Sequence, residues 1–132
     1  MLVSHADEDH IGGAVPLLLN ESISVRTVYV NPDVLRRTRV WKRFRMALAE
    51  AMQNRGTQIV TSVDTNTSGL LDCGEVRIEI LAPSPLLKLN GPGGEDLEGR
   101  RLNPNSMSTV VRLKVQDRPL VVLMGDLDEV GV

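Results

Sequence analysis

The chain has 132 residues, of which 42% are apolar, so one domain with a single buried core is expected. Its formal net charge is -2, from 15 basic and 17 acidic residues, which excludes a global positive field for nucleic-acid binding. Aromatic residues make up only 2% of the chain, which excludes the usual stacking platform of single-strand binders and predicts an aliphatic core.

Cysteine content and hydropathy limit the cellular compartment. Cys73 is the only cysteine, so an intrachain disulfide is excluded and a reducing, cytoplasmic location is expected. We interpret its side chain as a small member of the core. The longest apolar stretches, such as residues 119–124, are far shorter than the roughly 20 residues of a membrane-spanning helix, so no span is expected.

The first part of the chain predicts a strand, a helix and a second strand. Residues 1–4 are typical of the end of a buried strand, and a short helix is expected from residue 11 to about residue 20. Residues 23–30 alternate and are rich in β-branched side chains, which favours a strand that ends at Asn31 and Pro32.

The longest predicted element is a helix over residues 34–55, which no Gly or Pro interrupts. Asp33 is expected to be its N-cap and Gly56 its C-cap. One face of this helix is basic, and we interpret it as a solvated surface, with a track for nucleic-acid phosphates as the alternative. The basic residues are Arg36, Arg37, Arg39, Lys42, Arg43 and Arg45.

The remainder of the chain predicts mainly strands. A short strand is expected over residues 57–63, and the alternation over residues 76–81 indicates a half-buried strand. Residues 89–105 are rich in Gly, Asn and Pro and predict a long loop. Two further strands, residues 108–115 and 120–124, are joined by a turn. The whole pattern predicts the α/β (α+β) class, with helices that flank a mixed β-sheet.

Two histidines and two aspartates are concentrated just after the first strand. His5, Asp7, Asp9 and His10 lie within six positions, directly before a pair of glycines. Buried carboxylates are costly unless they are paired or bind a metal, and imidazole with carboxylate suits Zn²⁺, Mn²⁺ or Fe²⁺. The cluster therefore predicts a metal site, with a surface turn rich in Asp and His as the alternative interpretation.

Residues 4–13 have the sequence Ser-His-Ala-Asp-Glu-Asp-His-Ile-Gly-Gly. This segment resembles the His-x-Asp-x-Asp-His-x-Gly-Gly motif in the ComEC-like branch of the metallo-β-lactamase-fold hydrolases. Most of that superfamily has His-x-His-x-Asp-His, so Asp7 stands where a histidine is usual. Three later segments resemble the same family in the right order, and together the four cover most of the chain. They are the Leu-x-Pro strand over residues 76–83, the Asn-x-x-Ser strand over residues 105–113, and the Gly-Asp pair at residues 125–126.

The resemblance implies an αββα sandwich and a water molecule activated by one or two ions, Zn²⁺ or Mn²⁺. With two ions, His5 and Asp7 would bind one, Asp9 and His10 would bind the other, and Asp126 would bridge them. Asp7 and Asp9 would thereby be catalytic residues. The resemblance leaves two roles open for Asp9, which either binds an ion or orients the water.

Two residues of the Asn-x-x-Ser segment are candidates for the substrate site. The segment aligns near the place where other family members supply a third histidine, so Asn105 is implied as a weak ligand or substrate contact, with Asn103 as the alternative. Ser108 is the second candidate substrate contact. Ser106 and Ser108 are interpreted as strand and turn residues rather than nucleophiles, because no histidine is expected to be available as their general base.

The family pattern also includes strands before the first motif and a last histidine beyond the bridging aspartate. Neither has a counterpart in this sequence, so residues 1–132 are interpreted as a single partial domain, either a fragment or a truncated gene product. An exposed sheet edge is expected where the other half would pack, and it predicts homo-oligomers.

The function implied by the resemblance is hydrolysis of a phosphodiester, such as DNA, because the ComEC-like branch is associated with nuclease activity during DNA uptake. Hydrolysis of a small ester, thioester or lactam is a second hypothesis. A third is a non-catalytic remnant without metal that serves as an interaction module.

Overall fold

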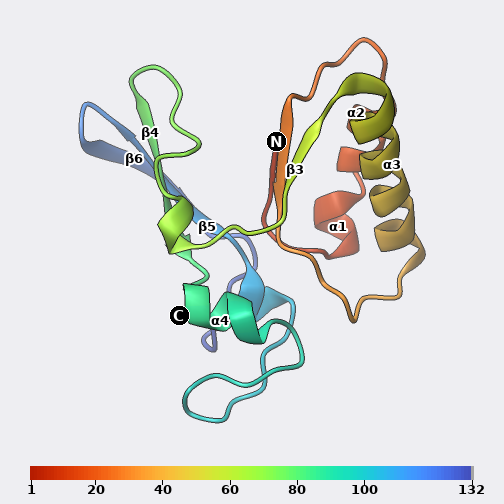
Figure 1. Ribbon diagram of the computed structural model, residues 1–132. Helices are drawn as coiled ribbons and strands as arrows, with labels where there is room; N and C mark the ends of the chain where they lie inside the picture. Colours follow the sequence, from red (N-terminus) through yellow and green to blue (C-terminus); the bar gives the residue numbers. More distant parts are fainter. Residues whose placement is uncertain (132) are drawn as a thin grey trace.

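The computed structural model describes residues 1–131 and contains two small sheets, one parallel and one antiparallel, together with helices (Figure 1). The α/β (α+β) class expected from the sequence is confirmed. The expected mixed sheet was wrong in detail, because the parallel and antiparallel strand pairs lie in separate sheets. Within these residues, every helix is too short or too polar to cross a membrane.

The parallel sheet forms the N-terminal layer. Its strands, in spatial order, are β1 (Leu2–Val3), β2 (Thr27–Val30) and β3 (Gln58–Val60). Parallel neighbours need crossover connections, and helices supply both of them here. These helices are α1 (Glu8–Ile11) and α2 (Ala14–Leu19) before β2, and α3 (Arg39–Arg55) before β3. Figure 1 shows all three helices on the same side of this sheet.

Helix α3 begins at Arg39, later than residue 34, where the sequence predicted its start. Thr38 is the N-cap, because its backbone is extended and its hydroxyl accepts the backbone N–H of Trp41. The prediction that Asp33 caps this helix was wrong, since its carboxylate accepts two backbone N–H groups of a separate turn. Gly56 has a φ of 67° and is confirmed as the C-cap.

The main core lies between α3 and the parallel sheet. Phe44, Leu18 and Val28 are fully buried there. The rings of Trp41 and Phe44 stack with their centroids 5.7 Å apart. The core is largely aliphatic, as expected, although the only Trp and the only Phe of the chain both belong to it.

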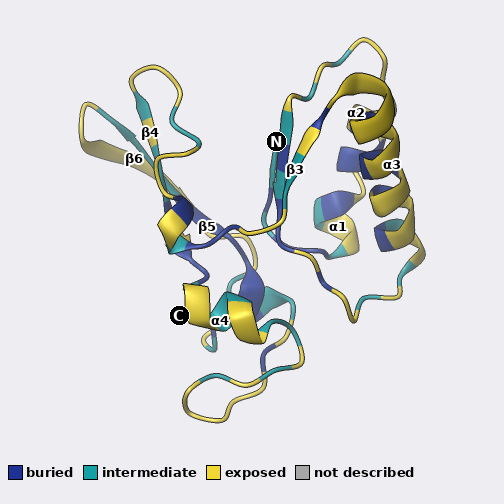
Figure 2. Ribbon diagram, in the orientation of Figure 1, coloured by how far each residue is buried: buried dark blue, intermediate teal, exposed yellow. Residues whose placement is uncertain are grey.

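The second sheet is an antiparallel meander with a small core. Its strands, in order, are β4 (Val76–Ala82), β5 (Val110–Val115) and β6 (Arg118–Leu123). The expected hairpin between β5 and β6 is confirmed, and it turns through Gln116 and Asp117 with φ values of 48° and 62°. Val63, Ile80 and Val111 form the core, while every residue of β6 is exposed (Figure 2).

The connection between β4 and β5 contains a short helix that the sequence analysis missed, α4 (Pro85–Asn90). Ser84 is its N-cap and accepts the backbone N–H of Leu87, and proline occupies the first turn. The expected loop after it folds back on itself through paired backbone hydrogen bonds that place Leu102 in a buried position. Two 3-10 turns, η1 (Thr65–Thr67) and η2 (Asn105–Met107), complete the regular structure of residues 1–131.

Cys73 is exposed, so its interpretation as a core residue was wrong. The residue lies in the turn before β4, where its backbone pairs with that of Val76. The strand that should carry it inward begins only after this turn, and the side chain therefore stays in solvent.

Candidate metal centre

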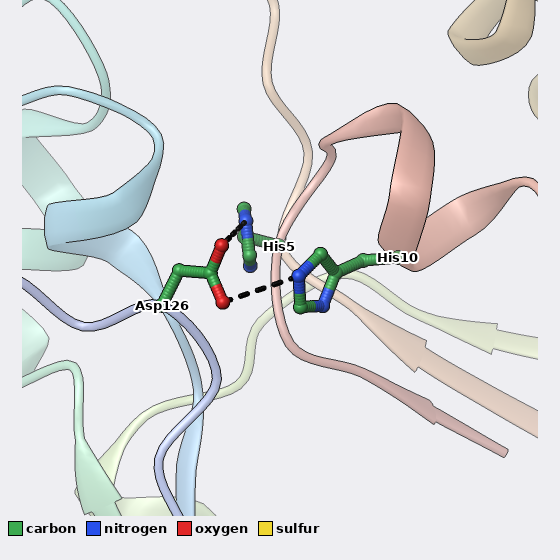
Figure 3. A group of neighbouring side chains, drawn as sticks. All are labelled: His5, His10 and Asp126. Carbon is green, nitrogen blue, oxygen red and sulfur yellow. Dashed lines mark ion pairs between the residues drawn. The ribbon is translucent and has the colours of Figure 1, made fainter.

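Two histidines from the start of the chain and one aspartate from its end lie together (Figure 3). His5 follows β1, His10 lies on α1, and Asp126 follows β6. One potential ligand atom from each side chain lies within 4.8 Å of the other two. This group can hold a metal ion, since imidazole nitrogens and carboxylate oxygens are ligands that Zn²⁺ accepts.

A close contact between the two layers brings Asp126 to the histidines. The backbone N–H of Thr109, just before β5, donates to the carbonyl of Ser4 at 2.9 Å. Gly125 has a φ of 56°, and a Cβ at this position would lie 3.1 Å from the Cβ of Ser4 and 3.3 Å from that of Ser108. A glycine therefore permits both the conformation and the close approach.

Serine hydroxyls hold the Nδ1 atoms of both imidazoles. The Oγ of Ser4 lies 3.1 Å from Nδ1 of His5 and 3.1 Å from Nδ1 of His10. The Oγ of Ser108 lies 3.2 Å from Nδ1 of His5 and accepts the backbone N–H of Asp126 at 3.3 Å. Because a hydroxyl oxygen can accept two hydrogen bonds, both Nδ1 atoms can donate and leave both Nε2 lone pairs free.

The Nε2 atom of His5 has no hydrogen-bond partner among the described residues, although it is buried. His5 is only 2% exposed, and its pKa is lowered, mainly by burial and then by the neighbouring His10. Asp126 and Asp9 oppose this shift through their negative charges. His5 is therefore neutral at pH 7, and a buried neutral nitrogen without a partner fits a divalent cation.

Asp126 lies beside the two imidazoles, whose ring centroids are 4.1 Å apart, and directs one carboxylate oxygen at each of them (Figure 3). Its Oδ1 is 3.2 Å from Nε2 of His10, and its Oδ2 is 3.9 Å from Nε2 of His5. Two ligands of a tetrahedral zinc ion, each at roughly 2.0–2.1 Å, lie about 3.3 Å apart. The distance between Asp126 and His10 therefore already suits two ligands of one ion. Asp126 and His5 would have to move slightly closer together to bind the same ion. With one oxygen near each histidine, the carboxylate of Asp126 can contribute a ligand atom beside either imidazole.

Asp7 and Asp9 each flank one histidine. The Oδ2 of Asp7 is 3.9 Å from Nε2 of His5, and the Oδ2 of Asp9 is 3.6 Å from Nε2 of His10. The Asp9 side chain is 76% exposed and that of Asp7 is 30% exposed. The side chains thus form two clusters that share Asp126, while the roles of Asp7 and Asp9 as ligands or catalytic carboxylates stay predictions.

The two candidate substrate contacts, Asn105 and Ser108, have different surroundings in the structure. Ser108 is fully buried, and its hydroxyl lies 3.2 Å from Nδ1 of His5, so the premise that no histidine is available to it was wrong. Asn105 is half buried at the start of η2, and its backbone N–H donates to the side chain of Asn103. Asn103 also donates to Asp128, which ties its amide to the C-terminal turn. Substrate binding by Asn105 and Ser108 stays a prediction.

Sequence analysis did not single out two residues that contact the centre, Ser4 and Arg36. The guanidinium of Arg36 forms an ion pair with Oδ1 of Asp7, and its Nε lies 3.4 Å from Oδ2 of Asp33. The sequence placed Arg36 on a solvated helix face, and the contact arises because the residue precedes α3 instead. Ser4 adjoins His5 in the motif, but the motif gave no sign of its double contact.

Two hollows adjoin the centre. A pocket of about 270 Å³ opens beside His5 and extends past Asp33. A second hollow of about 340 Å³ also borders Asp33 and is lined by Arg36, Arg37 and Arg101. The first pocket is therefore lined by a candidate ligand, whereas the second reaches the centre only through Arg36, which contacts Asp7.

Comparison with protein-family models gave no match, and no curated protein matches the chain. The resemblance to metallo-β-lactamase-fold hydrolases therefore depends on residues 4–13 and the three later segments alone. The fold and the site together define a mixed α/β protein with a histidine and aspartate group that can hold a metal ion.

Proposed function

We propose that this protein is a metal-dependent hydrolase of the metallo-β-lactamase type, with Zn²⁺ or Mn²⁺ at the candidate centre. The observation that carries the proposal is the meeting of His5, His10 and Asp126 from opposite ends of the chain. The buried Nε2 of His5 supports it further, because an unsatisfied buried polar atom is costly unless a ligand completes it.

Each part of the centre has a defined task in this proposal. A bound divalent cation lowers the pKa of a water ligand and stabilises negative charge that develops on the substrate. Ser4 and Ser108 keep the Nε2 atoms directed at Asp126 through their contacts with Nδ1. Asp9 is the most exposed of the three carboxylates and can accept a proton from water.

We infer that the substrate is a phosphodiester, such as DNA. Arg37 and Arg101 line a basic hollow that reaches the centre through Arg36, whose own guanidinium is paired with Asp7 and Asp33. Guanidinium groups bind phosphate oxygens through paired, charge-assisted hydrogen bonds. This local concentration of positive charge favours a polyanion even though the chain as a whole carries a net charge of -2.

A small ester, thioester or lactam is the second candidate substrate. The pocket beside His5 favours it, because side chains such as Leu89, Pro92 and Met107 give that pocket a largely apolar wall. This candidate shares the metal centre and differs only in which hollow holds the substrate.

An assay of the metal-loaded full chain tests the proposal. The chain is stripped of metal, reloaded with Mn²⁺ or Zn²⁺, and given bis(p-nitrophenyl) phosphate, DNA or p-nitrophenyl acetate. His10→Ala and Asp126→Asn are each expected to lower phosphodiesterase activity by roughly 100-fold or more, since each removes a ligand. Asp117→Asn makes the same charge change in an exposed turn, keeps wild-type activity, and serves as the matched control.

Each other outcome has a definite meaning. Phosphodiesterase activity that is unchanged in both ligand variants would contradict the proposed mechanism. Hydrolysis of the acetate ester without the phosphodiesters would favour the second substrate class. A folded chain that neither binds metal nor hydrolyses any of the three would be the non-catalytic interaction module.

We further propose that the chain forms homo-oligomers through β6. This strand is at the edge of its sheet, and its apolar side chains, such as Leu120 and Leu123, are exposed. An exposed edge strand offers unpaired backbone groups to a second strand. Light scattering after size exclusion should give a mass above that of the monomer, and Val122→Lys should restore the monomer. A monomeric wild-type chain would contradict this proposal.

A further inference from the structure

The carboxylate of Asp7 has two different partners, one for each oxygen. Its Oδ1 forms an ion pair with the guanidinium of Arg36, while its Oδ2 lies 3.9 Å from Nε2 of His5. One oxygen is thus held by a cationic side chain from the segment before α3. The other oxygen faces the position where His5 would bind a cation.

Arg36 is itself fixed on the side away from Asp7. Its Nε lies 3.4 Å from Oδ2 of Asp33, and the Asp33 side chain is only 7% exposed. The other oxygen of Asp33 accepts the backbone N–H groups of Leu35 at 3.0 Å and Arg36 at 3.1 Å. The guanidinium therefore lies in an ionic clamp between two carboxylates, and the Arg36 side chain is only 18% exposed, while its buried Nε has no hydrogen-bond partner among residues 1–131.

The centre also crowds negative charge. Asp7, Asp9 and Asp126 lie around two imidazoles, and like charges at this range repel. Within residues 1–131, the contact with Arg36 is the one ion pair that a lysine or arginine makes with these three aspartates. Arg36 therefore both orients a carboxylate and offsets part of its charge.

We propose that Arg36 is a positioning residue of the metal centre. Its guanidinium holds Oδ1 of Asp7 so that Oδ2 faces Nε2 of His5 and is available to a cation there. The inference rests on the proposed metal binding and adds an outer contact that sets the orientation of one ligand. Carboxylate ligands in metal sites generally depend on such hydrogen-bonded partners.

Metal affinity of the full chain tests this role. Zn²⁺ affinity is measured by competition with a chromophoric chelator, and the coordination is followed through the visible absorption of bound Co²⁺. Arg36→Ala is expected to weaken Zn²⁺ binding by about 10–100-fold and to change the Co²⁺ spectrum. Arg36→Lys should recover part of the affinity. Arg43→Ala, which removes an exposed arginine of α3 that has no part in the proposed substrate site, should match the wild type and is the control.

A double variant separates positioning from a general structural effect. In an Asp7→Asn background, Arg36→Ala should cause little further loss, because the carboxylate that it orients is already gone. Asp33→Asn retains the turn's acceptor oxygen and loosens only the clamp on Arg36. It should therefore weaken Zn²⁺ binding in the same direction by a smaller factor, and it serves as the second variant if Arg36→Ala does not fold.

Four outcomes would overturn the inference. Unchanged or tighter Zn²⁺ binding in Arg36→Ala would show that Arg36 is a bystander or competes with the cation. If Arg36→Ala weakens Zn²⁺ binding by the same factor in the Asp7→Asn background as in the wild type, Arg36 acts through the general structure and not through Asp7. Wild-type Zn²⁺ affinity in Asp33→Asn would exclude the clamp. Absence of Zn²⁺ binding by the wild-type chain would overturn this inference together with the proposed function.

Discussion

The parallel and antiparallel sheets differ in how much core supports them. The parallel sheet packs with α1, α2 and α3 around a continuous buried cluster that includes Phe44 and Leu18. The antiparallel sheet has only Val63, Ile80 and Val111 in its buried cluster, and β6 is exposed along its whole length (Figure 2). Much more buried apolar surface therefore stabilises the first layer than the second.

This difference matters because the candidate metal centre draws on both layers. His5 and His10 belong to the well-supported layer, whereas Asp126 follows the exposed strand β6. Asp126 reaches the histidines through local contacts of its backbone with Ser108 and of Gly125 with its neighbours. The comparison therefore predicts that the two imidazoles are held firmly and that the carboxylate depends on the docking of the second sheet.

Phe44→Ala should have the largest effect on stability, because it opens a cavity in the better-supported layer. The side chain is fully buried, and such a truncation lowers the free energy of unfolding by about 3–5 kcal/mol. Met46→Ala on the exposed face of the same helix is the control and should change it by less than about 0.5 kcal/mol. Urea denaturation measures both, and equal effects would contradict the assignment of the main core.

Asn31→Ala should break the link between the layers at a smaller cost. The Oδ1 of Asn31 accepts the N–H of Val63 at 2.8 Å, and its Nδ2 donates to the Val63 carbonyl at 2.7 Å. Removal of the amide leaves both buried backbone groups without partners, which lowers the free energy of unfolding by roughly 1–3 kcal/mol. Asn66→Ala, at an exposed asparagine in η1, is the control. If Asn31→Ala lowers the melting temperature no more than Asn66→Ala does, the hydrogen bonds between Asn31 and Val63 do not stabilise the contact between the layers.

Asp64→Asn should have the smallest effect, and that effect should depend on pH. The pKa of Asp64 is lowered, chiefly by its hydrogen bond with Lys88. Its carboxylate therefore stabilises the fold at pH values above the ordinary value of 3.8, and this contribution is lost as the pH falls below it. The wild type should exceed Asp64→Asn by roughly 0.5–1.5 kcal/mol at pH 7, because asparagine keeps one acceptor oxygen, and the difference should disappear in acid. A stability difference that grows as the pH falls would contradict a stabilising role of the ionised Asp64 carboxylate.

Local patterns predicted the elements whose signals lie close in sequence. The alternation that ends near Ala82, the β5–β6 hairpin and the C-cap Gly56 all follow from neighbouring residues. The start of α3 was misplaced because Asp33 and Thr38 carry equivalent capping signals, and only the fold decides which begins the helix. Short α4 was missed although Ser84 and the following proline are a recognisable start.

The site was predictable only as far as its ligands lie in recognisable motifs. The sequence pointed to His5, His10 and Asp126 as candidate ligands, and the structure brings these three together. The contacts of Ser4 with both imidazoles and of Arg36 with Asp7 depend on how separate segments pack. No local pattern encodes them.

The Zn²⁺ content of the metal-loaded chain after gel filtration tests the central claim most directly, because it asks whether both layers contribute ligands. We expect the wild type to retain Zn²⁺, and His5→Ala and Asp126→Ala to lose it. Asp117→Asn, on the exposed hairpin, should retain it, because asparagine tolerates the positive φ of this turn position. Equal Zn²⁺ content in the wild type and Asp126→Ala would contradict a metal centre shared between the two layers.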